Sequence, residues 1–575
     1  MNLRRKLLAF LQSQKKSVEY TELEWIGNEE NCYIFFPLVT AGKDIVELEY
    51  EAQFTRTDVQ QAEGKNGDPY FFIGLMPNSV WYAGCGYYGN STVKADTEWH
   101  NFRLVSCGDD NGFWLDGTRI YKSDQRDGVY LPQGFRLWIG QNGSRTTYNR
   151  KKYVKVKVNG KLVYDLIPVL DKDLVPCMYD KLTGKYFYND GDGEFTWKLP
   201  NQLEYLESTG TQYIDTEVVG TENTSIETGF EFTTTDVQYL FGSSVTYNTD
   251  TFCFSLNPAN TGKIYRVFIG ASTGTYGNVG EAFSTKMSVN NAYFSTTKIR
   301  LDDEVYDFTS VTPFTTPTPM YLFAKSNNGT ADYFAKVKVK FFKIYDNGVL
   351  VQYLIPAFDE DLTVCMYDLV SRKYFYNQGS GLFKGYFEDG SQLVSYLTAT
   401  GTQWIDTGII PLIGDELELK NVQCKKKSSG MQAVFSAGTG NYQLIILVAD
   451  GMYSDRASFF KYFASGGAKN INPPNYLNDP TKIKIDSEGN VFYNDVFIIQ
   501  SPPEKETDST LRLFYRANDS QPMTGNIGAV NIKRNDEFVI NLVPVLKSDN
   551  TACMFDLVSK KYFVNAGSGS FDYGG

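Results

Sequence analysis

The sequence is nearly without histidine: His100 is the one copy among 575 residues. Ser-His-Asp and Cys-His sites place a basic group beside their nucleophile, and the usual zinc sites combine cysteine and histidine at short spacing. Neither pattern occurs. His100 lies in 98–102, a stretch typical of a β-strand, which predicts a structural role for it. The sequence therefore favours a protein that is not an enzyme and that binds no metal through such a site.

Long apolar runs and recurring cysteine pairs are also missing. No run approaches the roughly 20 residues of a membrane span, and the apolar stretch 7–11 is too short for the core of a signal peptide. We therefore expect synthesis in the cytoplasm and no insertion into a membrane. Of the eight cysteines, only Cys177, Cys365 and Cys553 recur, one per repeat. Because a disulfide framework would repeat its pairs, these three are predicted to be buried, reduced thiols.

Basic charge is scarce outside the first 17 residues. The net charge is −12, yet residues 1–17 contain five Lys or Arg and no acid, so the remainder is more acidic still. Nucleic-acid binding needs clustered positive charge facing the phosphates. The composition therefore argues against a nucleic-acid partner.

What the sequence does contain is a long repeat. A closing motif reads Cys-Met-Tyr-Asp at 177–180, Lys-Tyr-Phe at 185–187 and Asn-x-Gly-x-Gly-x-Phe at 189–195. Two further copies follow at a constant spacing of 188 residues, ending at Phe383 and Phe571. Solenoid repeats have periods of about 20–50 residues, so the repeat predicts whole domains in tandem.

An opening motif marks the boundaries: Gly-Thr-Gln-Tyr-Ile-Asp-Thr at 210–216 returns as Gly-Thr-Gln-Trp-Ile-Asp-Thr at 401–407. The resulting division is a docking segment followed by segments 1, 2 and 3, at residues 1–17, 18–198, 199–387 and 388–575. The connectors are short, so neighbouring segments are expected to lie close together. Three similar domains favour binding by avidity over catalysis at one site.

The residue pattern inside each segment predicts an all-β fold. The chain contains 40 Tyr, 40 Phe and 50 Gly, a composition suited to strands and turns. Stretches such as 153–158 and 335–340 alternate apolar and basic residues, as half-buried strands do. Many short antiparallel strands in about 188 residues predict a two-sheet jelly roll for each segment.

Residues 1–17 are predicted to form a short amphipathic helix before the first jelly roll. Leu3, Leu7 and Leu11 recur at helical spacing, with Phe10 beside them. Because so short a helix is marginal alone, we expect it to dock on a partner. In decreasing order, the candidates are segment 1, a second copy in a homo-oligomer, another protein and a membrane surface.

The opening motif at 204–216 and the closing motif at 167–189 resemble a known family. They are similar to the concanavalin A-like, laminin-G-like jelly-roll modules of structural proteins of tailed phages and prophages. The resemblance covers 18–575 and implies three curved double sheets placed on a virion as a fibre, spike or capsid decoration, often with glycan binding. It carries over no catalytic or ligand residue. Segment 1 departs from it at 27–32, where the Gly-Thr-Gln stretch is replaced.

An aromatic stretch at 81–90 is the best local candidate for carbohydrate contact, because sugars stack on flat exposed rings. Its candidate ligand-binding residues are Trp81, Tyr82, Tyr87 and Tyr88. The alternative is a pair of core strands joined by a turn. Two acidic loops, at 189–192 and 359–361, have the residues for a Ca²⁺ site, although turn solvation is the interpretation that we favour.

The sequence therefore predicts a virion protein, made in the host cytoplasm, that is not an enzyme. It would attach to other virion proteins through its N-terminal segment and present three lectin-like domains to a cell-surface glycan. The alternatives are a bacterial carbohydrate-binding surface protein and a glycoside hydrolase on the same fold. A hydrolase needs two facing carboxylates, and the Glu-x-Asp-x-(x)-Glu motif of the jelly-roll glucanases is absent.

Overall fold

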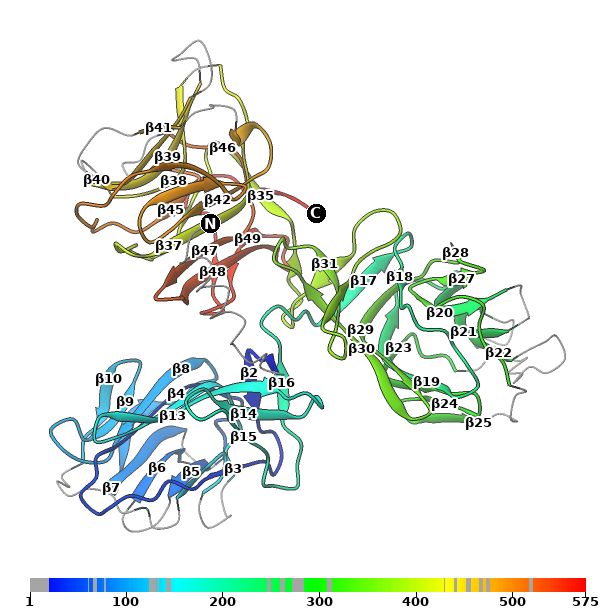
Figure 1. The fold of residues 1–575 in the computed structure, drawn as a ribbon, viewed down its shortest axis with the longest axis horizontal. Helices are drawn as coiled ribbons and strands as arrows, with labels where there is room; N and C mark the ends of the chain where they lie inside the picture. Colours follow the sequence, from blue (N-terminus) through cyan, green and yellow to red (C-terminus); the bar gives the residue numbers. More distant parts are fainter. Residues whose placement is uncertain are drawn as a thin grey trace, which may run out of the picture. The chain divides into compact units, whose positions relative to one another are not determined.

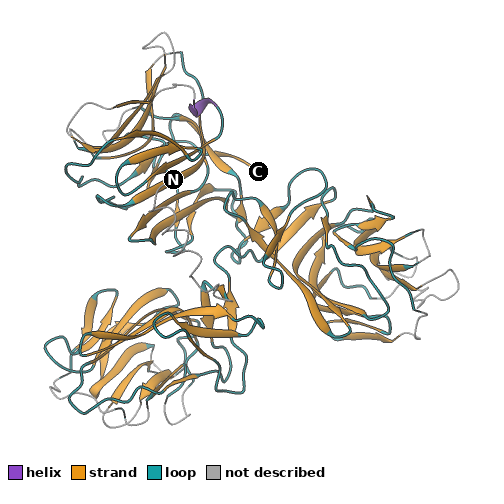
Figure 2. Ribbon diagram, in the orientation of Figure 1, coloured by secondary structure: helices purple, strands orange, loops and turns teal. Residues whose placement is uncertain are grey.

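The computed structural model describes residues 20–575 with gaps at 60, 66–69, 77–78, 124–130, 132–133, 141–145, 246–249, 259–263, 271–283, 308–312, 429, 439–441, 451–456, 465–468, 472–475 and 517–520. The chain divides into two compact units, Met1–Pro200 and Asn201–Gly575. The described part is all-β, as predicted, with one 3₁₀ turn, η1 (Tyr476–Asn478) (Figure 2). No described helix is long and apolar enough to span a membrane. The helix expected at 1–17 lies outside the described residues.

Segment 1 folds into a long antiparallel sheet that faces a three-stranded sheet and a two-stranded one, around one apolar core (Figure 1). The strands of its long sheet and its margin are β1 (Thr21–Glu22), β2 (Trp25–Gly27), β4 (Val46–Phe54), β8 (Trp99–Val105), β9 (Gly112–Leu115), β10 (Thr118–Tyr121), β12 (Asn149–Val158), β13 (Lys161–Leu170), β14 (Pro176–Asp180), β15 (Lys185–Phe187) and β16 (Thr196–Lys198). The facing strands are β5 (Gln61–Lys65), β6 (Tyr70–Leu75) and β7 (Val80–Lys94), beside the pair β3 (Ile34–Phe36) and β11 (Phe135–Leu137).

Segment 2 repeats this arrangement around a second core. Its long sheet and margin contain β17 (Tyr205–Thr209), β19 (Thr224–Phe232), β23 (Ser288–Phe294), β24 (Lys298–Leu301), β25 (Glu304–Asp307), β29 (Lys336–Asp346), β30 (Val349–Phe358), β31 (Val364–Asp368), β32 (Lys373–Phe375) and β33 (Lys384–Tyr386). The facing sheet contains β18 (Ile214–Asp215), β20 (Gln238–Ser244), β21 (Thr251–Leu256), β22 (Tyr265–Gly270), β26 (Tyr321–Leu322), β27 (Lys325–Asn327) and β28 (Thr330–Asp332).

Segment 3 encloses a third core. Its long sheet and margin contain β34 (Gln392–Leu393), β35 (Tyr396–Thr400), β37 (Glu416–Cys424), β42 (Thr481–Ile485), β43 (Asn490–Tyr493), β44 (Val496–Gln500), β46 (Thr524–Ile527), β47 (Val530–Arg534), β48 (Glu537–Leu546), β49 (Ala552–Asp556), β50 (Tyr562–Phe563) and β51 (Asp572–Gly574). The facing sheet contains β36 (Ile405–Asp406), β38 (Gly430–Ala437), β39 (Gln443–Asp450), β40 (Ala457–Ala464), β41 (Lys469–Ile471) and β45 (Arg512–Leu513).

The long sheets have the same strand order in all three segments. Eight strands run β10-β9-β8-β4-β12-β13-β14-β15 in segment 1, β25-β24-β23-β19-β29-β30-β31-β32 in segment 2 and β44-β43-β42-β37-β47-β48-β49-β50 in segment 3. Burial alternates along strands such as β4, as period-two patterning requires. Each segment is thus a two-layer β-sandwich, and the all-β part of the predicted fold class is confirmed.

The aspartate of the closing motif organises the turn after it. In segment 1, Asp180 Oδ1 accepts the backbone N–H groups of Asp165 and Leu182, at 3.0 and 3.2 Å. Asp368 and Asp556 accept the equivalent pairs of N–H groups in segments 2 and 3. The recurring acid therefore bonds to the backbone of its own hairpin.

The Asn-x-Gly-x-Gly stretch clamps the end of each segment to its beginning. Asn377 Oδ1 accepts the N–H groups of Gly379 and Tyr213, and its Nδ2 donates to the Gly381 carbonyl. A Cβ on Gly379 would lie 2.1 Å from the Thr211 carbonyl oxygen, so only glycine fits. The same contacts form around Asn189 in segment 1 and are repeated in segment 3.

A buried glutamine joins the two sheets of each sandwich. Gln238 on β20 accepts the Lys336 N–H of the long sheet at 2.6 Å and donates to the Thr234 carbonyl at 2.8 Å. Gln61 and Gln432 make the equivalent bonds on β5 and β38. These bonds show which residues occupy equivalent positions in the three cores.

Segments 2 and 3 are joined without a free linker. Strand β33 pairs with β34, and β34 pairs in turn with β48 of segment 3. Phe387, at the turn between β33 and β34, is buried against Phe555, with ring centroids 5.4 Å apart. The expectation of close packing across a short connector is confirmed for this pair.

The three recurring thiols are buried and unpaired, as the sequence predicts. The neighbouring methionine (Met178 in segment 1) packs in the sandwich core, whereas Cys177 packs on the opposite face of the sheet with Val169. Burial raises the pKa of the Cys177 and Cys553 thiols to about 12. Neither is a reactive thiolate at neutral pH.

Candidate functional site

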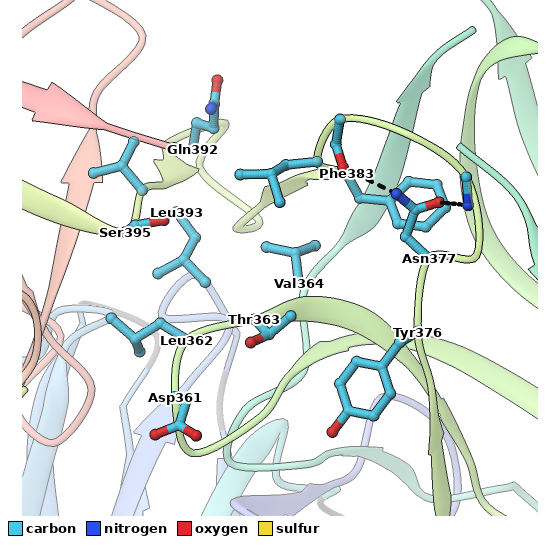
Figure 3. A pocket seen from close by; sticks show the side chains of 15 residues that line it. Asp361, Leu362, Thr363, Val364, Tyr376, Asn377, Phe383, Gln392, Leu393 and Ser395 are labelled. Carbon is cyan, nitrogen blue, oxygen red and sulfur yellow. Dashed lines mark hydrogen bonds between the residues drawn. The ribbon is translucent and has the colours of Figure 1, made fainter. Parts of the chain in front are cut away.

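A pocket of about 320 Å³ lies where segment 2 ends and segment 3 begins (Figure 3). Two turns of segment 2 form one side: 361–364, which leads into β31, and 376–383, which holds the Asn-x-Gly-x-Gly stretch. The first residues of segment 3, at 392–395, form the other side. The pairing of β33 with β34 fixes these walls relative to each other.

The pocket combines an apolar floor with a polar rim. Its apolar residues are Leu362, Val364, Leu382, Phe383, Leu393 and Val394, and its rim contains Asp361, Thr363, Tyr376, Gln392 and Ser395. Leu382 leaves 59% of its surface exposed. Tyr376 is held in place by a 3.0 Å hydrogen bond from its hydroxyl to Asp359. Apolar surface with a few oriented polar groups is typical of small-molecule and sugar sites.

The pocket wall differs between the repeats although the clamp beside it does not. The position of Leu382, directly before the last phenylalanine of the closing motif, is held by Glu194 in segment 1 and Ser570 in segment 3. Tyr376 likewise becomes Val564 in segment 3. A constant scaffold with changing side chains is what a family of binding surfaces requires.

Two of the predicted ligand-binding residues are buried in segment 1. Trp81 has no exposed surface and packs edge-on against Phe54, at 4.8 Å between ring centroids. Tyr82 is 3% exposed and donates to the Gln61 carbonyl. Both faces of β7 are covered here, so these rings are core residues and we assign no ligand contact to them. This is the alternative that the sequence left open.

The other candidates divide between an exposed ring and residues that the structure does not describe. Tyr88 is 62% exposed and contacts Tyr70, with ring centroids 5.1 Å apart. The Tyr87 side chain lies outside the described part of the structure. So do the predicted docking residues, Leu3, Leu7, Phe10 and Leu11.

His100 is held between two carboxylates. Its Nδ1 lies 2.6 Å from Asp116 and its Nε2 lies 2.8 Å from Asp96. Burial lowers the pKa of His100, but the two hydrogen-bonded acids outweigh it and the net shift is upward. Both nitrogens are thus occupied by acids, an arrangement that suits a structural histidine.

In the two acidic loops considered for Ca²⁺, aspartate side chains accept hydrogen bonds from backbone N–H groups. Asp359 Oδ1 accepts the N–H groups of Asp361 and Thr363, and Asp190 accepts the Phe35 N–H at 2.8 Å. Among the residues described, no three His, Cys, Asp or Glu side chains are placed to hold a metal ion.

Segment 1 contains a second feature, which the sequence did not predict: an ionic network in the core. Lys151 on β12 and Glu63 on β5 have no exposed side-chain surface, and Lys151 Nζ lies 3.0 and 2.8 Å from the two Glu63 oxygens. Tyr50 donates to Glu63 Oε1 and the Trp138 N–H donates to Oε2. Lys151 also donates to Asn149 Oδ1 at 2.6 Å.

Comparisons with known proteins leave the family of this chain open. No family model matches it, and neither does any curated protein. Similar solved structures include domains LG4-5 of the mouse laminin α1 chain (11% identity, 58% of this chain and 93% of that chain, TM-score 0.22). They also include the LG1-3 region of the laminin α2 chain (9%, 89% and 96%, 0.19) and a mutant of NanB sialidase from Streptococcus pneumoniae (11%, 64% and 75%, 0.16). At these TM-scores the likeness carries no argument about function, and the virion assignment stays a prediction.

Proposed function

We propose that this chain is a multivalent adhesion protein without enzymatic activity. Its segments 1, 2 and 3 would be tandem concanavalin A-like jelly-roll modules that bind neutral carbohydrate on a cell surface. The proposal includes display on a virion, with residues 1–17 attaching the chain to another virion protein or to a second copy.

The observation that carries the proposal is the pocket between segments 2 and 3. The ring of Tyr376 and the exposed face of Leu382 offer apolar surface, and the hydroxyls of Thr363 and Ser395 lie on the rim. A pyranose has the complementary surface, with one C–H face and a girdle of hydroxyls. The pocket volume is at the small end of the usual range, which suits one or two sugar rings.

The recurring polar residues support binding over catalysis. Asp180, Asn377 and Gln238 and their equivalents all bond to backbone groups of their own segment. The residues that recur are therefore those that hold the fold of each segment. Three linked copies of one fold gain affinity because binding at one site raises the effective concentration of the others. The acidic chain suits neutral or amino sugars better than sulfated ones.

The test is a glycan array probed with the full chain, followed by calorimetry on each hit. Tyr376→Ala is expected to weaken binding at the junction pocket about five-fold, the loss of roughly 1 kcal/mol of aromatic contact. Tyr88→Ala, which removes an exposed ring of segment 1 that is not part of this pocket, serves as the matched control and should leave the affinity unchanged.

Three results would overturn the proposal in different ways. A blank array together with a blank host-cell pull-down would remove the adhesive function. Binding that survives Tyr376→Ala but is lost in Tyr88→Ala would move the site to segment 1. Release of reducing sugar from a bound polysaccharide, abolished by changing one carboxylate, would replace adhesion with hydrolysis.

A further inference from the structure

The ionic network of segment 1 occupies three core positions that are apolar in segment 2. Counted from the sheet-joining glutamines, Glu63 aligns with Leu240 of segment 2, since each stands two residues after its glutamine. Leu240 forms a β-bulge with Phe241, and both of these apolar side chains are buried. Lys151 aligns with Val339, because Lys151 pairs with Ile26 of β2 as Val339 pairs with Leu206 of β17.

Asn149 aligns in the same way with Val337. Asn149 lies opposite Phe54, and Val337 lies opposite Phe232, at the ends of the equivalent strand pairs β12–β4 and β29–β19. All three segment 2 side chains are buried in the core. Segment 2 thus fills these positions with Leu, Val and Val, whereas segment 1 brings a carboxylate, an amine and an amide together.

The geometry of these three groups is that of a nucleophile, its base and an acceptor. The Lys151 amine contacts both Glu63 oxygens and donates to Asn149 Oδ1 at 2.6 Å, so the amine and the side-chain amide are in direct contact. The Asn149 Nδ2 is buried, and no group among the described residues forms a hydrogen bond with it. An unpaired buried N–H₂ is costly, and it is the group that an acyl transfer would release.

The surroundings make the Lys151 ammonium easier to deprotonate than that of an exposed lysine. Burial lowers the pKa of Lys151 to about 8, with Glu63 acting in the opposite direction. The centroids of the Tyr50 and Trp138 rings lie 4.6 and 4.7 Å from Nζ, and the Lys151 side chain has no exposed surface. A desolvated lysine with a neighbouring carboxylate is an activated nucleophile.

We propose that Lys151 and Asn149 form an intramolecular amide bond, with Glu63 as the proton-transfer group. Glu63 takes a proton from the Lys151 ammonium, and the free amine attacks Asn149 Cγ. A bond forms between Nζ and Cγ, the bond between Cγ and Nδ2 breaks, and Nδ2 takes one proton from the attacking amine to leave as ammonia. Lys–NH₃⁺, Glu–COO⁻ and Asn–CONH₂ thus become Lys–NH–CO–Asn, Glu–COOH and NH₃, with atoms and charge balanced and no oxidant required.

The product removes each unfavourable feature of the network. Two buried charges become neutral groups, which relieves the desolvation cost of an ion pair in a core. The unpaired Nδ2 is gone, and the protonated Glu63 can donate to the new carbonyl. The bond closes a small ring along β12, so its effect is to neutralise and fix the core rather than to tie distant strands together.

The decisive measurement is the intact mass of the purified full-length chain, with peptide mapping of 149–151. We expect a loss of about 17 Da, one ammonia, and resistance to tryptic cleavage after Lys151. The measurement needs no variant, so it does not depend on a mutant folding. Unmodified mass and ordinary cleavage after Lys151 would overturn the proposal.

Variants separate the amide from other losses of ammonia. Lys151→Arg keeps the positive charge but should lose no ammonia, and Glu63→Gln should also prevent the reaction. Lys152→Arg, at the neighbouring position paired with Glu51, is the matched control and should still lose ammonia. A loss of the same mass that persists in Lys151→Arg would indicate cyclisation of Asn149 onto the backbone and would refute the cross-link.

Discussion

Segments 1 and 2 have the same strand order and fill the centre of their cores in opposite ways. Segment 2 fills it with Leu240, Val337 and Val339, whereas segment 1 holds charged and polar groups at the same places. A buried ion pair seldom stabilises a fold more than apolar residues of similar volume. The difference therefore points to chemistry or specificity in segment 1.

The largest expected effect on stability comes from removing one member of the ionic network in segment 1. Lys151→Met leaves Glu63 buried without its partner and should lower the opening free energy of β12 by about 3–5 kcal/mol. The triple variant Glu63→Leu, Asn149→Val and Lys151→Val, which copies segment 2, should recover most of that loss. Hydrogen exchange of the β12 amides in the full chain measures both, with the β29 amides of segment 2 as an internal control. Equal protection in the single and triple variants would contradict the account.

The second effect tests the Asn-x-Gly-x-Gly clamp, which all three segments share. Gly191→Ala places a Cβ 1.9 Å from the Asn31 carbonyl oxygen, and we expect a local cost of about 2–3 kcal/mol from overpacking. Gly379→Ala, at 2.1 Å from the Thr211 oxygen, should cost the same in segment 2. Hydrogen exchange of the amides on each side of the clamp measures both costs.

Gly42→Ala is the control for these two variants, because a Cβ there meets no atom within 4 Å. It should be neutral when the local unfolding of segment 1 is followed by hydrogen exchange. A cost for Gly42→Ala as large as for Gly191→Ala would show that the clamp is not the cause.

The repeat and the alternation of residues predicted most of the fold, because both are visible in the order of the residues without knowledge of which distant residues pack together. The two-layer sandwich and the buried thiols follow from them. The burial of Trp81 and Tyr82 did not, since covering both faces of β7 depends on neighbours distant in sequence such as Phe54 and Phe72.

The pocket and the ionic network could not be predicted from the sequence either, for a related reason. The pocket forms between turns of segment 2 and the start of segment 3, and no motif spans both. For the ionic network a partial signal exists, because the 188-residue spacing aligns Lys151 with Val339. The spacing fails at Glu63, where the segments differ in length, and only the sheet-joining glutamines align it with Leu240.

A smaller effect concerns the turn after the aspartate of the closing motif. One position of this turn is glycine in segment 1 and arginine in segment 2. Gly184 has φ +73° in segment 1, whereas Arg372 adopts the left-handed conformation at φ 59° in segment 2. Because a side chain there costs about 1 kcal/mol, Arg372→Gly should stabilise its hairpin by that amount and Gly184→Arg should destabilise its own. Hydrogen exchange at β32 and β15 checks both signs, and shifts in the same direction would contradict the strain argument.

The smallest effect is a pH dependence of segment 1, the segment that contains the one histidine. Burial lowers the pKa of His100, but the hydrogen bonds to Asp116 and Asp96 raise it by more, so the folded-state pKa lies above the unfolded one. The folded state therefore binds its proton more tightly than the unfolded state does. The resulting stabilisation is complete below about pH 6.5, the unfolded value, and is lost as the pH rises through the folded pKa.

The size of this effect is limited by solvent, because Asp96 and Asp116 are both about half exposed. We expect less than about 1 kcal/mol. Hydrogen exchange of β8, corrected for intrinsic rates, should show protection that falls with rising pH in the native chain and stays flat in His100→Gln. A slope that survives this substitution would assign the pH dependence to another group, because His100 would then contribute nothing to the difference between the segments.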